Sequence, residues 1–263
     1  MKHIVLTQPT VRSESLKAAL SAGGWQSFEV PMSLIAEVPD LDWPAICATA
    51  AQARWVLFPS PGAIAVVMAA LERQGLIWPE GPGIGLIGPG SGEMLAIWQS
   101  RTPGLARAVT IAPSLAPFDA DRLLARPELV RIGGETVMVL RRADGREDWL
   151  NTLTERGAEV IAQSVYRMIE LAPSPVADEW FGTTASQATP FAFSIASADA
   201  GRRLASHVSS LSCAGWLMSQ PVLTQHPRIA QSLRDQGWPD VREHPPGVRA
   251  LVHALESLRK PHP

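Results

Sequence analysis

Tyr166, the only tyrosine among the 263 residues, lies near the end of the segment 137–167, which also contains a strongly basic turn. That turn carries Arg141, Arg142 and Arg146. A phenol can donate a proton or a hydrogen bond to a reacting group. A guanidinium can bind a carboxylate through two parallel hydrogen bonds. These residue types are therefore candidates for proton donation and for carboxylate binding.

Both assignments have simpler structural alternatives. A tyrosine is often an amphipathic packing residue whose hydroxyl binds a backbone carbonyl. The basic turn is followed or interrupted by Asp144, Glu147 and Asp148, which can neutralise the arginines locally. The sequence leaves these alternatives open.

Four short turns rich in Gly, Pro, Ser and Thr each connect an apolar run to a helical pattern. They are Thr7-Gln8-Pro9-Thr10, Ser60-Pro61-Gly62, Gly88-Pro89-Gly90-Ser91 and Gly145-Arg146. Parallel sheets bind ligands beyond the carboxyl ends of their strands, and helix N-termini attract anions through free N–H groups. The turns predict sites for carboxylate groups, although helix capping alone also explains each one.

Short apolar runs alternate with helical patterns along the whole chain, which predicts parallel βαβ units and the α/β class. The expected strands are 4–7, 55–58, 84–87, 109–111, 136–140, 159–162, 191–194, one within 216–223, and 240–243. The expected helices are 11–22 with Thr10 as N-cap, 61–73, a helix ending at 99, a helix from a capping box of Asp144 and Glu147 to 156, 197–207, 226–236 and 248–258.

Two extended segments, 27–37 and 163–171, are not followed directly by a helix. If they pair, residues 30–35 and 164–171 form a two-stranded connector. One α/β domain is then discontinuous, 1–29 plus 172–263, and the other is the inserted segment 36–163. A single large domain is the alternative for a chain of this length.

Composition limits the classes of protein to consider. The net charge is −2, so no basic field favours nucleic acid. The N-terminus lacks the apolar core of a signal peptide, and the longest apolar run, 63–71, is too short to span a bilayer. Cys47 and Cys213 have no partner at metal-ligand spacing. We expect a cytoplasmic, metal-free protein, and a monomer because no heptad pattern is left over.

The ordered set of motifs resembles the uroporphyrinogen-III synthase family over nearly the whole chain. The motifs are Thr7-Gln8-Pro9 after the first strand, Phe58-Pro59-Ser60-Pro61-Gly62-Ala63, Ile87-Gly88-Pro89-Gly90-Ser91, Arg141 with Gly145-Arg146, Gly157-Ala158-Glu159-Val160, Val165-Tyr166-Arg167, Phe193-Ser194 through Ser197-Ala198, and His226-Pro227-Arg228-Ile229-Ala230.

The resemblance implies two flavodoxin-like parallel-sheet domains joined by a two-stranded ladder, with the active site in the cleft between them. It implies cyclisation of hydroxymethylbilane to uroporphyrinogen III in heme biosynthesis, with inversion of the terminal pyrrole ring and no cofactor. Tyr166 would assist loss of the hydroxyl group. The expected substrate-binding residues are Thr7, Gln8, Pro9, Ser60, Pro61, Gly62, Ser91, Arg141, Arg146, Ser197 and Arg228.

The chain also departs from the family pattern. Gln8 stands where the family usually has Arg, and Ser91 where it usually has Thr. Ile229 replaces a hydroxyl residue in the second Gly-x-x-Thr turn, and His226 replaces its glycine. These departures motivate an alternative hypothesis, a two-domain protein that binds tetrapyrroles or anions without catalysis. Transient contact with the upstream hydroxymethylbilane synthase is a further expectation, because the substrate is unstable.

Overall fold

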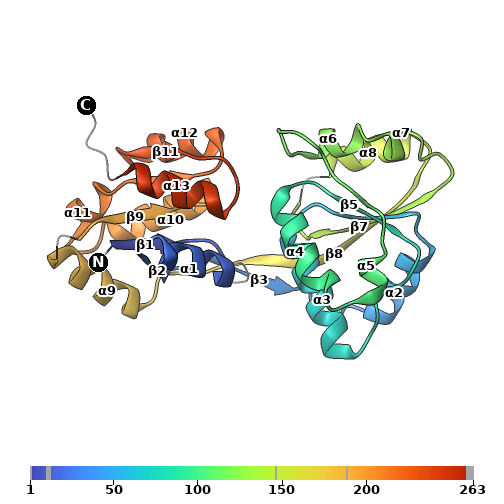
Figure 1. Ribbon diagram of the computed structural model, residues 1–263, viewed down its shortest axis with the longest axis horizontal. Helices are drawn as coiled ribbons and strands as arrows, with labels where there is room; N and C mark the ends of the chain where they lie inside the picture. Colours follow the sequence, from blue (N-terminus) through green and yellow to red (C-terminus); the bar gives the residue numbers. More distant parts are fainter. Residues whose placement is uncertain (1, 10–12, 146, 188, 259–263) are drawn as a thin grey trace. The chain divides into compact units, whose positions relative to one another are not determined.

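The computed structural model describes residues 2–9, 13–145, 147–187 and 189–258. The chain forms two compact units (Figure 1). Unit 1 comprises Met1–Leu34 and Ile169–Pro263, and unit 2 comprises Ile35–Met168. In the described parts of the chain, no helix is both long enough and apolar enough to cross a membrane.

Unit 1 contains one parallel sheet with the strand order β11-β10-β9-β1-β2. Read in chain order from the other edge, this order is 2-1-3-4-5, which is the flavodoxin-like arrangement. Its strands are β1 (Lys2–Leu6), β2 (Trp25–Glu29), β9 (Phe191–Ser194), β10 (Val222–Thr224) and β11 (Val241–Glu243). Its helices are α1 (Ser13–Ala22), α9 (Pro175–Ser186), α10 (Ala198–Val208), α11 (Ala214–Met218), α12 (Pro227–Asp235) and α13 (Val248–Ser257).

Unit 2 is built on a sheet with the strand order β3-β8-β7-β4-β5-β6. Its strands are β3 (Ser33–Glu37), β4 (Trp55–Phe58), β5 (Gly83–Leu86), β6 (Thr110–Ile111), β7 (Thr136–Arg142) and β8 (Glu159–Glu170). Its helices are α2 (Trp43–Gln52), α3 (Pro61–Gln74), α4 (Pro89–Gln99), α5 (Pro103–Ala106), α6 (Ala120–Leu124), α7 (Pro127–Val130) and α8 (Asp148–Glu155). If the two-residue β6 is left out and the parallel strands β4, β5, β7 and β8 are numbered 1 to 4 along the chain, their order across the sheet is 2-1-3-4.

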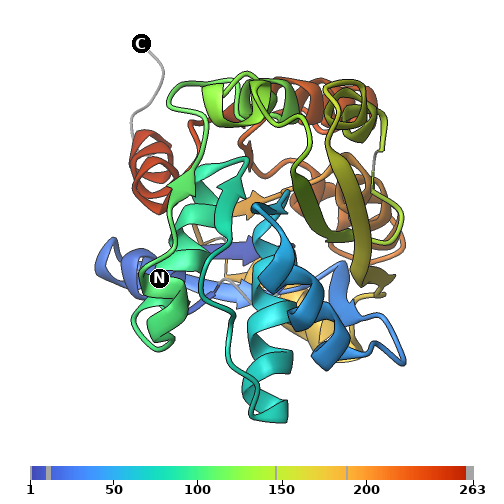
Figure 2. The same cartoon turned by 90° about the vertical axis from the view of Figure 1, so that its right-hand side faces the viewer.

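Helices cover both faces of each sheet, so the central strands are apolar on both sides (Figures 1 and 2). In unit 2, Val56 and Phe58 of β4 pack toward α2, α3 and α4. Trp55 and Leu57 point to the opposite face and pack with residues of α6, α7 and α8. Unit 1 repeats this arrangement, with α1 and α13 on one face and α9 to α12 on the other. The predicted α/β class is confirmed, with two sheets of mainly parallel strands.

The units are connected through neighbouring strands of the sheet in unit 2. The chain passes between units at Leu34–Ile35, inside β3, and at Met168–Ile169, inside β8. β3 and β8 are adjacent in the sheet. Both passages therefore lie in hydrogen-bonded strands.

Several local expectations from the sequence were wrong. β8 is one strand of twelve residues, where we expected a short strand followed by a separate extended segment. The expected extended segment 27–37 is divided between two strands. Its first residues belong to β2, which is parallel to β1, and its last residues form β3. The predicted capping box does not form: Glu147 pairs with Arg141, Asp144 pairs with Arg142, and α8 begins at Asp148. The missed helices are α2, α5, α6, α7, α9 and α11, and Thr10 lies outside the described residues.

Candidate active site

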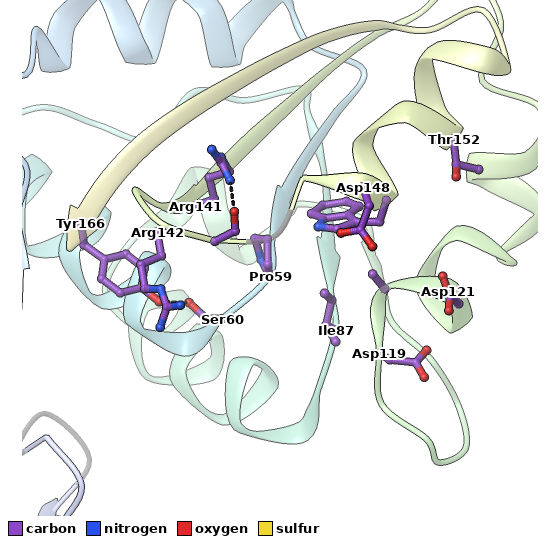
Figure 3. Close-up of a pocket in the computed structure, with 13 residues that line it drawn as sticks. Pro59, Ser60, Ile87, Asp119, Asp121, Arg141, Arg142, Asp148, Thr152 and Tyr166 are labelled. Carbon is purple, nitrogen blue, oxygen red and sulfur yellow. Dashed lines mark hydrogen bonds between the residues drawn. The ribbon is translucent and has the colours of Figure 1, made fainter. Parts of the chain in front are cut away.

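A pocket of about 480 Å³ lies in unit 2 beyond the carboxyl ends of β4 and β7. These two strands are neighbours, and the chain winds away from them in opposite directions. Such a switch point is where open parallel sheets bind ligands. The lining residues are Pro59, Ser60, Ile87, Asp119, Ala120, Asp121, Arg141, Arg142, Gly145, Asp148, Trp149, Thr152 and Tyr166 (Figure 3).

A pair of hydroxyl groups lies on one side of this pocket. Tyr166 OH is 2.8 Å from Ser60 Oγ, and either group can be the donor. Ser60 is the N-cap of α3, and its Oγ also accepts a hydrogen bond from the Ala63 backbone N–H at 3.3 Å. Pro61 occupies the first helical turn, where its missing N–H costs nothing. The start of α3 therefore holds Ser60 against the phenol.

An irregularity in β8 sets the position of Tyr166. From Thr136 to Arg141, each β7 residue pairs with the β8 residue 23 positions later, but Arg142 pairs with Tyr166. Val165 is the extra residue. Both Val165 and Tyr166 are buried next to this irregularity. A bulge of this kind re-aims a side chain, and here it brings the phenol into the pocket.

Gly62 allows the phenol to lie close to α3. A Cβ atom added at Gly62 would lie 3.3 Å from Tyr166 Cζ, 3.4 Å from Tyr166 OH and 2.9 Å from Ile35 Cδ1. The last distance is shorter than real Cβ contacts. A larger residue at this position would displace the end of Ile35 and lie tightly against the phenol, so the glycine leaves room for Tyr166.

Arg141 lines the pocket but is already engaged with its own turn. It is a buried residue, with only 8% of its surface exposed. Nη1 donates to the Gly145 carbonyl at 2.8 Å, Nη2 pairs with the Glu147 carboxylate, and Nε has no partner among the described residues. Arg142 pairs with Asp144 at 2.7 Å. Local neutralisation of the basic turn, one of the two alternatives, is therefore present, and Arg146 lies outside the described residues.

Sequence reasoning missed the acidic side of the pocket. Asp119, Asp121 and Asp148 line it opposite the hydroxyl pair (Figure 3). Asp119 caps α6 by accepting a hydrogen bond from the Arg122 backbone N–H at 2.9 Å. An aspartate before a helix was the available signal, but it indicates capping and not a pocket. In the described ranges, no three His, Cys, Asp or Glu side chains are grouped closely enough to bind a metal ion.

Ser91 does not line this pocket, although it belongs to the same unit. It lies in the first turn of α4 and is 2% exposed. Its backbone N–H donates to the Gly88 carbonyl at 3.0 Å. Ser91 is therefore part of a helix start and not of an open turn.

The remaining predicted residues lie in unit 1, at the carboxyl ends of its strands. Thr7 is buried, and its Oγ1 donates to the Ser194 carbonyl at 2.9 Å; Gln8 and Pro9 follow it and are partly buried. Ser197 is the exposed N-cap of α10 and accepts from the Ala200 N–H at 3.1 Å. These residues occupy strand ends and helix starts, as the sequence predicted.

Arg228 is exposed in the first turn of α12, where its backbone N–H donates to His226 Nδ1 at 3.1 Å. His226 is thus the N-cap of that helix. The guanidinium of Arg228 has no hydrogen bond or ion pair with any described residue.

Comparison with known proteins identifies relatives of the whole chain. The sequence matches the family described as Uroporphyrinogen-III synthase HemD over residues 14–253. It is 29% identical over 246 residues to the uroporphyrinogen-III synthase of Salmonella typhimurium strain LT2, covering 91% of this chain and 93% of the relative.

The fold is similar to solved structures of the same name. One is a mutant uroporphyrinogen III synthase from the extremely thermophilic bacterium Thermus thermophilus, with a TM-score of 0.53, 16% identity, and coverage of 99% of this chain and 100% of that chain. Another is uroporphyrinogen-III synthetase from Helicobacter pylori 26695, with a TM-score of 0.52, 14% identity, and coverage of 98% and 100%. At these identities the likeness supports the fold.

Proposed function

Because the chain belongs to the uroporphyrinogen-III synthase family, we propose that it converts hydroxymethylbilane, a linear tetrapyrrole, into the macrocycle uroporphyrinogen III. The protein is an enzyme of tetrapyrrole biosynthesis. The reaction releases water and closes a ring, so the enzyme acts as a cyclising hydro-lyase in the heme pathway. The observation that best supports this activity is the contact between Tyr166 OH and Ser60 Oγ, 2.8 Å long, inside a pocket at a strand switch point.

The chemistry begins with cleavage of the C–O bond of the hydroxymethyl group. The oxygen takes one proton and leaves as water, and the pyrrole supplies the electron pair that turns the terminal methylene into an azafulvene cation. The substituted carbon of the last ring attacks this cation and gives a spirocyclic intermediate. Fragmentation and reclosure at the other carbon invert the ring, and loss of a ring proton balances the proton that left in water.

Tyr166 donates the proton, or a hydrogen bond, to the departing hydroxyl group. Ser60 orients the phenol, and it can donate in turn to the phenolate oxygen after the proton has moved. The fixed position of Ser60 at the start of α3 makes this arrangement ready before the substrate binds. Uncatalysed closure gives the isomer without inversion, so positioning of the last ring is as important as proton transfer.

The substrate carboxylates bind at helix starts and at cationic side chains. In unit 2 these are Pro61 and Gly62 in the first turn of α3, Ser91 in the first turn of α4, and the Nε of Arg141. Arg146 belongs to the same basic turn. In unit 1 the binding residues are Thr7, Gln8 and Pro9 after β1, Ser197 at the start of α10, and Arg228 at the start of α12.

No organic cofactor or metal ion takes part in this proposal, because acid assistance and positioning account for the bond changes. We place the enzyme in the cytoplasm as a monomer. It receives its unstable substrate from the upstream hydroxymethylbilane synthase, through transient contact or by diffusion.

A coupled assay tests the proposal. Hydroxymethylbilane is generated with its synthase, the protein is added, the products are oxidised, and uroporphyrin isomers I and III are separated by chromatography. Isomer III in proportion to added protein is the expected result. Isomer I alone, from protein that is folded by circular dichroism, would contradict the proposal. Tight tetrapyrrole binding under those conditions would support a non-catalytic binding protein instead.

A further inference from the structure

The pocket that contains Tyr166 has two chemically different sides (Figure 3). One side presents the hydroxyl groups of Ser60 and Tyr166. The other side, here called the acidic wall, consists of Asp119, Asp121 and Asp148. An acidic wall is unexpected next to a substrate that is itself a polycarboxylate, because like charges repel.

The two described arginines of the pocket are paired with carboxylates outside the acidic wall. Arg141 is paired with Glu147 and Arg142 with Asp144, and neither of these carboxylates lines the pocket. Arg141 and Arg142 therefore neutralise carboxylates that do not line the pocket. Asp119 and Asp121 add negative charge to the pocket itself.

Structural roles account for only part of the acidic wall. Asp119 uses Oδ1 to cap α6. The side chain of Asp121, in the first turn of α6, has no hydrogen bond or ion pair with any described residue. An acidic residue in a first helical turn stabilises the helix only weakly. The five-residue α6 already has Asp119 as its N-cap, so helix stability does not require Asp121. Asp121 is thus held beside the pocket without a local partner.

A second observation in the same pocket points to a ligand. Arg141 is buried to all but 8% of its surface, and its Nε has no hydrogen-bond partner among the described residues. A buried donor without a partner is costly, and a carboxylate of a bound molecule would satisfy it once binding opens access to this atom, which is closed to solvent in the structure. The pocket thus offers a donor for a carboxylate on one side and carboxylates of its own on the other.

We infer that the acidic wall stabilises the positive charge of the azafulvene that forms when the hydroxyl group leaves. This inference rests on the proposed function. As the C–O bond breaks, positive charge spreads over the pyrrole ring and its nitrogen, while the substituents of that ring stay anionic. A pocket with a donor side and a carboxylate side matches both parts of such a ring. Fixed negative charge that interacts with charge present only in the transition state increases kcat.

The acidic wall should affect kcat and the affinity for anionic ligands in opposite directions. Removing a carboxylate from the pocket weakens stabilisation of the cation, but it also removes repulsion against a polycarboxylate. We therefore expect kcat to fall while affinity for the anionic product stays the same or increases. A purely structural role, or a role in gripping the substrate, would weaken both together.

The test uses Asp121→Asn and the double variant Asp119→Asn/Asp121→Asn. Asparagine keeps the size of each side chain, and it caps helices as well as aspartate does. The matched control is Glu155→Gln, which removes one exposed negative charge from α8 away from the pocket lining. The measurements are kcat for isomer III in the coupled assay and the dissociation constant of uroporphyrin III, a stable polycarboxylate, by fluorescence quenching.

We expect kcat to fall by about fivefold for each carboxylate, the effect of a unit charge a few ångströms away in a strongly screened site. Binding of uroporphyrin III should be equal or tighter, and Glu155→Gln should match wild type. Unchanged kcat in the double variant, or weaker product binding in proportion to kcat, would overturn the inference. Wild-type protein that forms only isomer I would instead remove the proposed function and this inference with it.

Discussion

Tyr166 and Ser60 are separated by 106 positions in the chain, yet their hydroxyl oxygens lie 2.8 Å apart. Ser60 begins a helix and Tyr166 follows a bulge in β8, so two independent backbone features bring the groups together. The contact lies within one unit of the protein and does not depend on how the units are arranged. It is therefore the most direct place to test the mechanism.

Replacing Tyr166 with Phe should reduce kcat by about 10²-fold, within the range for loss of a general acid. Activity should not disappear, because a phenol is a weak acid and positioning contributes independently. The coupled assay gives the rate, and the free energy of unfolding in urea shows whether the core is intact. Wild-type turnover by a folded Tyr166→Phe protein would exclude Tyr166 from the mechanism.

Ser60→Ala separates the two roles of Ser60, helix capping and orientation of the phenol. The loss of the cap should cost about 1 kcal/mol of stability. The loss of the hydrogen bond to Tyr166 should lower kcat by roughly fivefold, since a typical hydrogen bond is worth about 1 kcal/mol net. Both quantities are measured on the same protein preparation.

The chain provides a matched control in Ser174, the N-cap of α9. Its Oγ accepts from the Ala177 N–H at 3.3 Å, and Pro175 follows it, as Pro61 follows Ser60. Ser174→Ala should lose similar stability with no change in kcat. If Ser174→Ala slowed the reaction as much as Ser60→Ala, the rate effect would come from capping and not from the phenol.

Gly62→Ala should slow the reaction through the geometry of the phenol. The new methyl group would lie 2.9 Å from Ile35 Cδ1 and 3.4 Å from Tyr166 OH, so the side chains must shift. We expect kcat to fall several-fold because the phenol shifts, and the stability to change by no more than about 1 kcal/mol, because the end of Ile35 can move and a helix favours alanine over glycine. Gly92→Ala in α4 is the control, because its methyl group meets no atom within 4 Å. That variant should be as active as wild type and at least as stable.

Much of the fold was predictable because local signals agreed with tertiary structure. The strand 191–194 is a short apolar run, and it is found where predicted. Helix α2 was missed even though the sequence contains two helix start signals, Asp42 at the N-cap and Pro44 in the first turn. In the structure, Asp42 accepts a hydrogen bond from the Ala45 backbone N–H. The small residues of its sequence weakened the helical pattern.

Sequence motifs identified some of the residues that line the pocket, but not how they are arranged. Ser60, Arg141 and Tyr166 were identified from motif order, and they line one pocket. The bulge at Val165 depends on how β8 pairs with β7, and the alternation of side chains along a single strand cannot reveal it. Asp121 was missed because it reaches the pocket through packing of α6 near α8, in a region where no element was expected.

A final prediction concerns unit 1, where His244 follows β11. The residue is 6% exposed, its Nδ1 lies 2.8 Å from the Pro245 carbonyl, and its backbone N–H donates to the Thr224 carbonyl. Burial lowers the pKa of His244 below its ordinary value of 6.5, and the hydrogen bond to Pro245 opposes this only in part. Burial and the nearby N-terminal charge lower the pKa of His3 in the same direction.

Because the folded-state pKa of His244 lies below the unfolded value, the unfolded chain binds more protons once the pH falls below 6.5. The stabilising contribution is complete above that pH and is lost as the pH falls toward the folded-state pKa. The free energy of unfolding in urea should therefore be lower at about pH 5.5 than at about pH 8. His244→Gln should reduce this difference, whatever its effect on stability at high pH. His253→Gln, at a side chain that is 87% exposed, should leave the difference unchanged. An unaltered pH dependence in His244→Gln would show that protonation of His244 does not limit the acid stability of unit 1.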